Sequence, residues 1–336
     1  MIIPVLDGGE EFEQCLEALS RSGFRDWDVV VVDDGSTDRS VEVARSRAAR
    51  VMATDGRRGP GAARNAGARI APGECLFFLD ADCAVHPDTL ERAVAVLRAD
   101  DRVDAVFGSY DDQPASPGVV SRYRNLLHHW IHQRGRAEAS TFWAGCGAIR
   151  RSAFESVGGF DADRYPRPSI EDIDLGVRLR ASGGRIVLAR DVQVKHLKRW
   201  TLLGAIRTDV VARAAPWTEL ALRSGGFPRD LNVDIGGRAS VAGTWGALAS
   251  LAAALWWPGF LALAALLLIA VVANNLPFYR FLARHGRATF AILSIPPHLL
   301  HFLAAGAGFA LGIARHLRWR LFQRHGESNP ASTRSV

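Results

Sequence analysis

Short runs of apolar residues alternate with amphipathic segments along the first third of the chain. In the segment 9–23, apolar residues recur at helical spacing at Phe12, Cys15, Leu16 and Leu19. Five apolar runs have the length of strands buried on both faces, and they lie at 2–6, 26–34, 50–54, 74–82 and 104–110. Strands that alternate with helices of about 10–15 residues predict right-handed βαβ units around a parallel sheet.

The alternation ends after Tyr110. We predict a basic amphipathic helix, a small-residue segment leading into a helix, a helix closed by two glycines and a pair of strands, at 121–136, 141–160, 169–184 and 185–196. From Trp200 onward, tryptophan and arginine accompany apolar residues, as is typical of helices at a membrane interface. We therefore predict an α/β domain at 1–200 and interfacial helices at 201–238.

Two stretches in the last third are too apolar for an ordinary soluble surface. No charged residue occurs between Arg238 and Arg280, or between Arg287 and Arg315. A single helix over the first stretch would be about 60 Å long, roughly twice the hydrocarbon core. A hairpin that turns near 257–259 fits better. We expect a membrane region at 239–315 with two or three spans, at 239–256, 258–276 and 288–314.

The last of these stretches has two interpretations. Pro296 and Pro297 interrupt it, so it is either a third span or a kinked, re-entrant helix. Arginines on both flanks place both ends in the cytoplasm under the positive-inside rule, which conflicts with a simple third crossing. We expect a multi-pass protein of the cytoplasmic (inner) membrane whose N-terminal domain faces the cytoplasm. A tail that is first basic and then disordered follows at 316–336.

Charge and cysteine content narrow the class of protein. The formal net charge is +6, and Lys195 and Lys198 are the only lysines. Because arginine is dense between the apolar stretches, a membrane surface is favoured over nucleic acid, and we expect no nucleic-acid partner. The four cysteines lie far apart without a CxxC pair, so we expect reduced thiols. The N-terminus lacks the pattern of a signal peptide, and a strand that begins at Met1 leads us to expect a start a few residues upstream.

Acidic residues follow two of the predicted strands directly. Asp33 and Asp34 end one run, and Asp80 and Asp82 end another. The carboxyl ends of parallel strands meet at one edge, where open α/β sheets bind ligands. Carboxylates repel an anion, so the pattern predicts a divalent cation that in turn holds a diphosphate. The alternative is that these acids cap helices, a role that needs only one acid of each pair.

Two further pairs are candidates for chemistry. Arg64 and Asn65 lie just inside a helix entered from a Gly-Pro-Gly loop, where a helix N-terminus and an arginine fork both favour a diphosphate. The alternative is a surface arginine. Glu171 and Asp172 open the predicted helix at 169–184, where a carboxylate is placed to take a proton from a hydroxyl. The alternative is a capping box with Ser169.

Histidines carry weaker hypotheses. His196 is either a metal or diphosphate contact or an ordinary structural residue. His128 and His132 have the spacing of zinc ligands on one helix face, but the glutamate of an HExxH motif is absent. His298 and His301 lie in the last apolar stretch, where an ionisable group either has a function or marks an interface.

Four motifs, in this order, resemble glycosyltransferase family 2: VVVDDGSTD at 30–38, GPGAARNAG at 59–67, FFLDADC at 77–83 and EDIDLGVRL at 171–179. The resemblance covers about residues 1–200 and is to the membrane-anchored bacterial type. It implies the GT-A fold, a Rossmann-like, mixed but mostly parallel α/β sheet flanked by helices. It also implies a hexosyltransferase of the cell envelope that transfers one sugar, with inversion, from a UDP-linked or, less favoured, GDP-linked donor, using Mg²⁺ or Mn²⁺.

The resemblance also implies roles for the candidate residues. Asp34, with Asp33, holds the base, Asp82 and Asp80 hold the metal, and Asp172 is the catalytic base. Glu171 belongs to the catalytic pair. The other residues expected to contact the nucleotide are Pro4, Asp7, Arg64, Asn65 and Asp80. His196 is expected at the metal. Trp143, Gly145 and Cys146 are expected at the acceptor.

The chain departs from the family pattern at two places. Where the family has an IPxYN-like strand end, this chain has Leu6 and Asp7, so stacking on the base is not expected there. Lys198-Arg199-Trp200 only echoes the QxxRW motif of processive synthases, which favours transfer of a single sugar. The membrane region and the basic helix predict a lipid-linked or saccharide acceptor at the membrane face. The alternatives are a nucleotidyltransferase with a similar sheet, a phosphatase of the haloacid dehalogenase class, and a catalytically inactive membrane scaffold.

Overall fold

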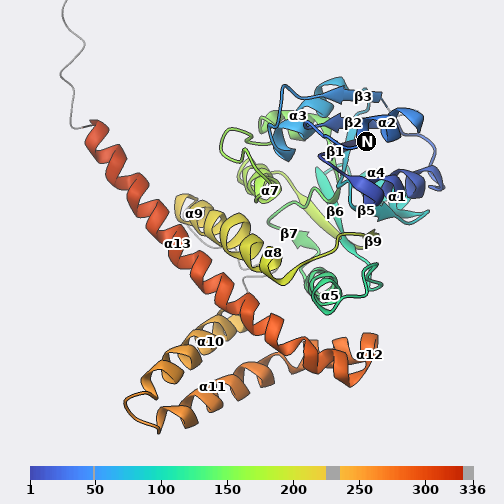
Figure 1. Cartoon of the computed structure of the whole chain (residues 1–336). Coiled ribbons are helices and arrows are strands. Elements are labelled where there is room, and N and C mark those ends of the chain that lie inside the picture. Colours follow the sequence, from blue (N-terminus) through green and yellow to red (C-terminus); the bar gives the residue numbers. More distant parts are fainter. Residues whose placement is uncertain (48–49, 225–234, 328–336) are drawn as a thin grey trace, which may run out of the picture. The chain divides into compact units, whose positions relative to one another are not determined.

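The computed structural model describes residues 1–47, 50–224 and 235–327, which form two compact units (Figure 1). The first, here called the sheet unit, contains Met1–Thr201 and Pro277–Ser294. The second, the helical unit, contains the described residues of 202–276 and 295–327.

One mixed sheet forms the centre of the sheet unit, with the strand order β3-β2-β1-β4-β8-β6-β9-β5 and β7 paired to β9. Pairing is parallel from β3 through β4, and the small-residue segment supplies β8, which runs antiparallel between β4 and β6. The strand bounds are Ile2–Val5 (β1), Val30–Asp33 (β2), Arg50–Ala53 (β3), Cys75–Leu79 (β4), Cys83–Val85 (β5), Ala105–Tyr110 (β6), Glu138–Ala139 (β7), Cys146–Arg150 (β8) and Ile186–His196 (β9).

All five predicted strand runs are confirmed, but the strand pair expected at 185–196 is wrong. This segment is one strand, β9, which is paired with β6 and β5. Its register against β6 shifts between Phe107 and Ser109, so the polar residues in the middle of β9 form an irregularity instead of a turn. A Cβ on Gly108 would lie 2.0 Å from the carbonyl oxygen of Val192, so the bulge requires glycine at this position.

Alternate strand residues pack into two cores, one on each face of the sheet. Ile3 and Val31 contribute to the core that contains α1 and α4, whereas Ile2 and Val30 contribute to the core that contains α3 and α7. The helices of this part are Gly9–Ser20 (α1), Ser40–Ser46 (α2), Pro60–Ile70 (α3), Thr89–Ala99 (α4), Val119–Arg134 (α5), Arg151–Ser156 (α6) and Glu171–Ala181 (α7).

A helix from the C-terminal third, α12 (Leu276–Leu293), packs on α5 within the sheet unit. Aromatic rings form this contact: the Tyr123 and Phe278 centroids lie 6.2 Å apart, and those of Trp130 and Phe281 lie 5.1 Å apart. The helical backbone of α12 is interrupted at Gly286 and Arg287. The basic helix expected at 121–136 is therefore present as α5, and α12 covers part of its surface.

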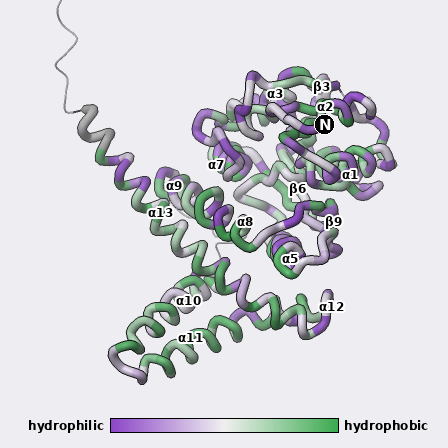
Figure 2. Tube along the Cα trace, viewed as in Figure 1, coloured by the Kyte–Doolittle hydropathy of each residue, from purple (hydrophilic) through white to green (hydrophobic). Residues whose placement is uncertain are grey.

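The helical unit consists of apolar helices, which Figure 2 shows as mostly hydrophobic along α10 and α11. Helices α10 and α11 pack together and turn at 254–259, where the hairpin was predicted, whereas its crossing of a membrane stays a prediction. Asn274 Nδ2 donates to Ser240 Oγ (2.9 Å) and ties the open end of the hairpin. The bounds are Leu202–Arg207 (α8), Thr208–Ala214 (η1, a π-helix), Ala215–Arg223 (α9), Ile235–Ala253 (α10), Phe260–Asn274 (α11) and Ile295–Glu327 (α13).

The stretch expected as one span at 288–314 is not one helix. It begins in the last turns of α12, breaks at Ser294 and continues as α13. Pro296 and Pro297 lie in the first turn of α13, where a missing backbone N–H breaks no helical hydrogen bond. Within α13, Ile295–Leu321 is long and apolar enough to cross a membrane, whereas α11 and α12 meet the same test only together, as a bent pair. The number of spans thus stays a prediction.

Ser36 and Thr37 have side chains suited to cap a helix, but α2 begins at Ser40, and both residues hydrogen-bond Asp7 instead. The tail expected to be basic and then disordered is helical from 316 to Glu327, and the remaining residues, 328–336, lie outside the described part.

Candidate active site

Arg64 joins the end of β4 to the start of α7. Its Nη2 lies 2.7 Å from Asp80 Oδ1, and its Nη1 lies 2.8 Å from Glu171 Oε1. The second oxygen of Glu171 accepts a hydrogen bond from the backbone N–H of Ser169 (2.9 Å). The guanidinium is 5% exposed and also lies over the ring of Phe160. We predicted that Arg64 contacts a diphosphate. Both of its terminal nitrogens, Nη1 and Nη2, face carboxylates of this chain.

Asp172 lies beside this ion-pair group, at the start of α7. The capping box considered for Ser169 and Asp172 does not form, because α7 begins after Ile170. Instead, Asp172 Oδ2 accepts a hydrogen bond from the backbone N–H of Ala144 (3.1 Å). Burial raises the pKa of Asp172 to about 7, and the negative charge of Glu171 adds to this shift. The carboxylate is therefore half-buried, held in one place and ready to exchange a proton near neutral pH.

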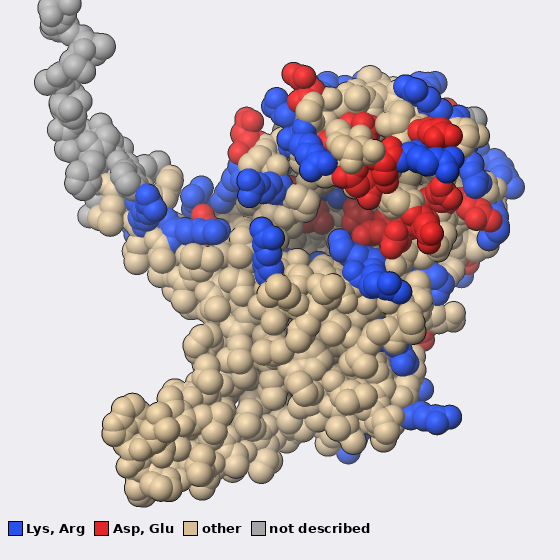
Figure 3. All heavy atoms as spheres, in the orientation of Figure 1, with Lys and Arg blue, Asp and Glu red and all other residues tan. Residues whose placement is uncertain are grey.

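Asp80 and Asp82 follow β4, and their environments differ. Burial raises the pKa of Asp80, although the Arg64 charge opposes the shift. Asp82 Oδ2 lies 3.7 Å from His196 Nε2 and 3.6 Å from Lys198 Nζ. Burial by itself would raise the pKa of Asp82, but the hydrogen bond to His196 and these positive charges hold it below its usual range. Figure 3 shows acidic side chains gathered on the visible face of the sheet unit, with basic ones around them.

A stack of rings fixes the orientation of His196. The ring of Tyr110 stacks on it, with centroids 4.1 Å apart and planes 10° apart. His128 covers the same tyrosine at 4.1 Å, and Trp143 meets it edge-on at 5.0 Å. Tyr110 thus connects the end of β9 with α5.

The three histidines of α5 serve this packing. His128 and His132 contact each other ring to ring, at 3.9 Å. His129 Nδ1 lies 2.8 Å from the carbonyl oxygen of Tyr110, and His132 Nδ1 lies 2.8 Å from that of Gly108. Within residues 1–47, 50–224 and 235–327, no group of three or more His, Cys, Asp or Glu side chains is placed to hold a metal ion by itself.

Asp34 organises the loop that leads into α3. Its Oδ1 accepts hydrogen bonds from Thr54 Oγ1 (2.8 Å) and from the backbone N–H of Arg58 (2.9 Å), and its Oδ2 accepts one from Gly59 N–H (2.8 Å). Both oxygens of the residue expected to hold the base are thus used within the chain. Asp34 therefore holds this loop in place.

Asp33 and Asp7 stand at neighbouring strand ends. Asp33 Oδ1 accepts from the backbone N–H of Ser36 (3.0 Å), and the described residues provide no hydrogen bond to its second oxygen. Asp7 has a positive φ of 50° and accepts a hydrogen bond from the Thr37 N–H at 2.6 Å. This backbone hydrogen bond lowers the pKa of Asp7, and the charge of Arg57 contributes to the shift. Asp33 is therefore the aspartate of this edge with an unused oxygen.

The remaining predicted nucleotide contacts have structural partners. Asn65 exchanges two hydrogen bonds with the backbone of Phe160, at 2.7 and 2.9 Å, and so ties α3 to the segment before α7. Pro4 is half-buried in β1, where it pairs with Val32 of β2. Neither position excludes a ligand nearby, but the Asn65 amide is already engaged.

Of the three residues expected at the acceptor, Trp143 is the one with exposed surface. Its indole lies against Gly145, where a Cβ would approach within 2.4 Å of the ring. The Gly145 carbonyl accepts from the backbone N–H of Asp80 (3.2 Å), which links this segment to the end of β4. Cys146 pairs with Leu79 inside the sheet and is fully buried, so its thiol faces no open space.

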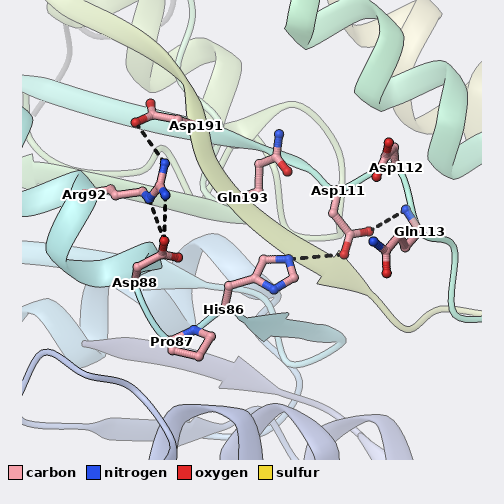
Figure 4. Close-up of a pocket in the computed structure, with 9 residues that line it drawn as sticks. All are labelled: His86, Pro87, Asp88, Arg92, Asp111, Asp112, Gln113, Asp191 and Gln193. Atoms are coloured by element: carbon pink, nitrogen blue, oxygen red, sulfur yellow. Dashed lines mark hydrogen bonds and ion pairs between the residues drawn. The ribbon is translucent and has the colours of Figure 1, made fainter.

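A cavity of about 630 Å³ lies elsewhere on the sheet unit (Figure 4). Its charged groups pair with one another: Arg92 bridges Asp88 and Asp191, and His86 Nε2 lies 3.2 Å from Asp111 Oδ2. None of the acids described above lines this cavity, so the candidate site is the group around Arg64. The lining residues are His86, Pro87, Asp88, Arg92, Asp111, Asp112, Gln113, Asp191 and Gln193.

Three groups at the site were not predicted from the sequence. They are the ring of Tyr110, the ammonium group of Lys198 beside Asp82, and the backbone N–H of Ala144. An aromatic residue that ends a buried strand is a usable signal for the first. The other two depend on how β9 and the segment before β8 fold back, which no local pattern encodes.

Comparisons with known proteins identify the family of the chain. Residues 1–158 match the family model "Glycosyl transferase family 2". The chain is 30% identical to Glycosyltransferase AglE of Haloferax volcanii over 59% of this chain and 66% of the relative. It is 32% identical to a PGL/p-HBAD biosynthesis glycosyltransferase of Mycobacterium bovis over 53% of this chain and 68% of the relative. The chain thus spans about two thirds of the length of these curated relatives.

The fold also matches a solved structure, that of the mannosyltransferase PcManGT from Pyrobaculum calidifontis, which was determined with GDP-Man and Mn²⁺. The TM-score is 0.58 at 22% identity, over 92% of this chain and 86% of that one. Fold and relatives together define a glycosyltransferase with a GT-A sheet. The chain belongs to glycosyltransferase family 2.

The ion pairs of Arg64 lead to a stability prediction. Arg64→Met leaves Glu171, whose side chain is 6% exposed, as a buried charge without its partner. We expect the free energy of unfolding to fall by about 3–5 kcal/mol, as for other broken buried ion pairs. Thermal or chemical unfolding of the full chain measures this loss. Arg69→Met, on the exposed side of the same helix, is the matched control, and equal losses in both variants would contradict the prediction.

Proposed function

We propose that this chain is an inverting glycosyltransferase that moves one sugar from a nucleotide-diphospho-sugar to a hydroxyl or phosphate acceptor. The observation that carries the proposal is the convergence of Asp80, Asp82 and Asp172. Arg64 pairs with both Asp80 and Glu171, and Asp172 is the next residue after Glu171. A backbone path of hydrogen bonds, through Gly145 and Ala144, joins the same two aspartates.

The donor side is assigned to the edge formed by β1, β2 and the loop before α3. Asp33 has an oxygen available for the imide N–H of uracil or the amino edge of guanine, and Asp34 positions the loop beside it. We keep a UDP-linked donor as the first expectation and a GDP-linked donor as the alternative. The PcManGT structure, with a similar fold, contains GDP-Man and Mn²⁺, and both nucleotides therefore belong in the assay.

The donor set around Asp82 suits Mg²⁺ or Mn²⁺. Carboxylate oxygens are hard ligands, and Mg²⁺ is commonly held by one or two carboxylates plus substrate phosphates instead of an all-protein cage. Asp82, together with Asp80 or the neighbouring imidazole of His196, would hold the cation, and the donor diphosphate would supply further ligands. When bound, the cation would neutralise charge on the departing diphosphate as a Lewis acid.

Asp172 is the proposed catalytic base. Its Oδ2 is fixed by the Ala144 N–H, so the carboxylate keeps one orientation while the acceptor hydroxyl approaches. It accepts the proton of that hydroxyl as the oxygen attacks the anomeric carbon, and the nucleoside diphosphate leaves from the opposite face. One displacement inverts the configuration. Glu171, engaged with Arg64, positions α7 and raises the basicity of its neighbour.

The acceptor is proposed to be lipid-linked and to meet the enzyme at the cytoplasmic face of the membrane, with a soluble saccharide as the alternative. Apolar helices support this: Leu266 and Ile269 of α11 are 62% and 66% exposed, and α13 is long enough to span a bilayer. Figure 3 shows the α10–α11 hairpin with almost no charge on its visible surface. Aliphatic side chains exposed in this number favour lipid contact.

The decisive experiment incubates membranes that carry the protein with labelled UDP- and GDP-sugars and Mn²⁺, and then separates lipid from aqueous products. Label in the lipid fraction supports the whole proposal. Label only in a soluble saccharide refutes the lipid acceptor but supports transfer. Pyrophosphate release identifies a nucleotidyltransferase, and donor binding without any product identifies an inactive scaffold. The latter two outcomes overturn the proposal.

Asp172→Asn tests the base. The amide keeps the shape of the side chain but cannot take the proton, so we expect turnover to fall about 10²–10⁴-fold while nucleotide affinity changes little. Transfer rates and donor titrations on the same preparation measure the two effects. Asp163→Asn, an exposed aspartate before α7, is the control and is expected to leave both unchanged. Parallel loss of turnover and binding in Asp172→Asn would indicate a structural role.

The raised pKa of Asp172 predicts a pH dependence. Below about pH 7 the carboxyl of the free enzyme is protonated and cannot accept a proton, so kcat/KM should rise with pH and reach half its maximum near 7. The sign for stability is the reverse: the folded state binds this proton more tightly than the unfolded chain, so the stabilisation is lost as pH rises toward 7. A kcat/KM profile that is flat from pH 5 to 9 would contradict the assignment.

The ring stack predicts how Tyr110 acts on metal binding. Tyr110→Leu removes the ring that holds His196 toward Asp82, so Mn²⁺ affinity, measured by calorimetry without donor, should fall several-fold. Tyr110→Phe keeps the ring and should restore affinity. Adding Tyr110→Leu to His196→Ala should cause no further loss, because both changes act through the same imidazole. Additive losses, or an equal loss in the buried-tyrosine control Tyr123→Leu, would contradict this.

A further inference from the structure

Helix α12 presents a row of arginines on its exposed side. Arg280 and Arg284 lie four residues apart on one face of α12, Arg287 lies at the break in its helical backbone, and all three are exposed. In the described part of the chain, no carboxylate pairs with any of them. By contrast, other arginines of the sheet unit, such as Arg92 and Arg185, form ion pairs with aspartates. Three neighbouring cations without an internal partner favour an anionic partner outside the chain.

The opposite side of α12 is held firmly in place. Arg122 of α5 lies over the ring of Phe290 at 4.2 Å and donates a hydrogen bond to the carbonyl of His285 (2.9 Å). His285 Nε2 lies 3.1 Å from Asp112 Oδ2. A Cβ on Gly286 would lie 2.6 Å from Arg122 Nη2 and 2.7 Å from the ring of Phe290, so glycine at this position leaves room for both side chains. The arginine row therefore has a fixed orientation on the sheet unit.

The position of α12 in the chain identifies what it faces. It follows α11 directly and precedes α13, and both of these helices are apolar. Near its own ends, Leu276, Ile292 and Leu293 are 39%, 63% and 57% exposed. With α11 and α13 in the bilayer, as proposed above, the arginine-bearing helix between them lies at the bilayer boundary. Arginines flanked there by exposed aliphatic residues are typical of interfacial helices.

We propose that Arg280, Arg284 and Arg287 bind the headgroups of anionic phospholipids and so fix the sheet unit to the membrane surface. The guanidinium fork matches the two free oxygens of a phosphodiester. This inference depends on the membrane association in the proposed function, but not on glycosyl transfer. It concerns a surface separate from the acids and rings of the candidate active site.

Lipid retention tests the proposal without any turnover. The detergent-solubilised full chain is titrated with phosphatidylglycerol or phosphatidylcholine, and bound lipids are counted by native mass spectrometry. The variant carries Arg280→Gln, Arg284→Gln and Arg287→Gln. Each arginine near an anionic surface contributes a factor of about five in affinity, so we expect at least a tenfold loss of phosphatidylglycerol affinity and no change for phosphatidylcholine. The control carries Arg45→Gln, Arg47→Gln and Arg69→Gln, three exposed arginines of the sheet unit.

Three outcomes would overturn the proposal: equal retention by the variant, equal loss in the control, or no preference for phosphatidylglycerol in the wild type. Soluble glycerol 1-phosphate is added as a competitor, and displacement of the lipid at millimolar concentration would mean that the row binds free phosphate instead. Unfolding temperatures of both triple variants should equal that of the wild type, which separates lipid binding from folding. Lipid retention by a protein that transfers no sugar would overturn only the proposed function. Sugar transfer by a protein that retains no lipid would overturn only this inference.

Discussion

The pairing of one buried arginine with two carboxylates is the constraint on which the candidate active site depends. A guanidinium that is 5% exposed is tolerated only when its charge is compensated. Asp80 comes from the end of β4 and Glu171 from the start of α7, so the pairing fixes how far apart these elements lie. The next residue, Asp172, is thereby held against the segment before β8. The guanidinium of Arg64 thus sets the distance between the proposed metal-binding aspartates and the proposed catalytic base.

The sequence predicted the sheet and the acids well, because both depend on local pattern. Continuous apolar runs identified the first five strands, and the aspartates that end two of those runs lie at the sheet edge where parallel strands finish. The predictions that failed concerned residues whose contacts are with partners distant in the sequence. Polar residues inside β9 looked like a turn, yet β6 accommodates them through the backbone space that Gly108 leaves. Likewise, Ser36 and Thr37 have the chemistry of caps but bond to Asp7 instead.

The roles of individual site residues were harder to predict than their positions. Arg64 and Asp34 are predicted to contact the donor, and within this chain Arg64 pairs both terminal nitrogens with carboxylates and Asp34 accepts hydrogen bonds at both oxygens. Nothing local distinguishes an arginine that binds phosphate from one that compensates carboxylates 16 and 107 residues away. The place of α12 was hidden for the same reason: the sequence shows only arginines between two apolar stretches there, and the rings of Phe278 and Phe281, together with the contacts of Arg122, attach the helix to the sheet unit.

Helix α5 contacts the candidate site and α12 at the same time. His128 stacks on Tyr110, while Trp130, two residues further on, packs on Phe281. One residue inserted between these positions would turn everything beyond it by about 100°, and one of the two contacts would be lost. Among homologues, the length of this helix should therefore be more conserved than its composition.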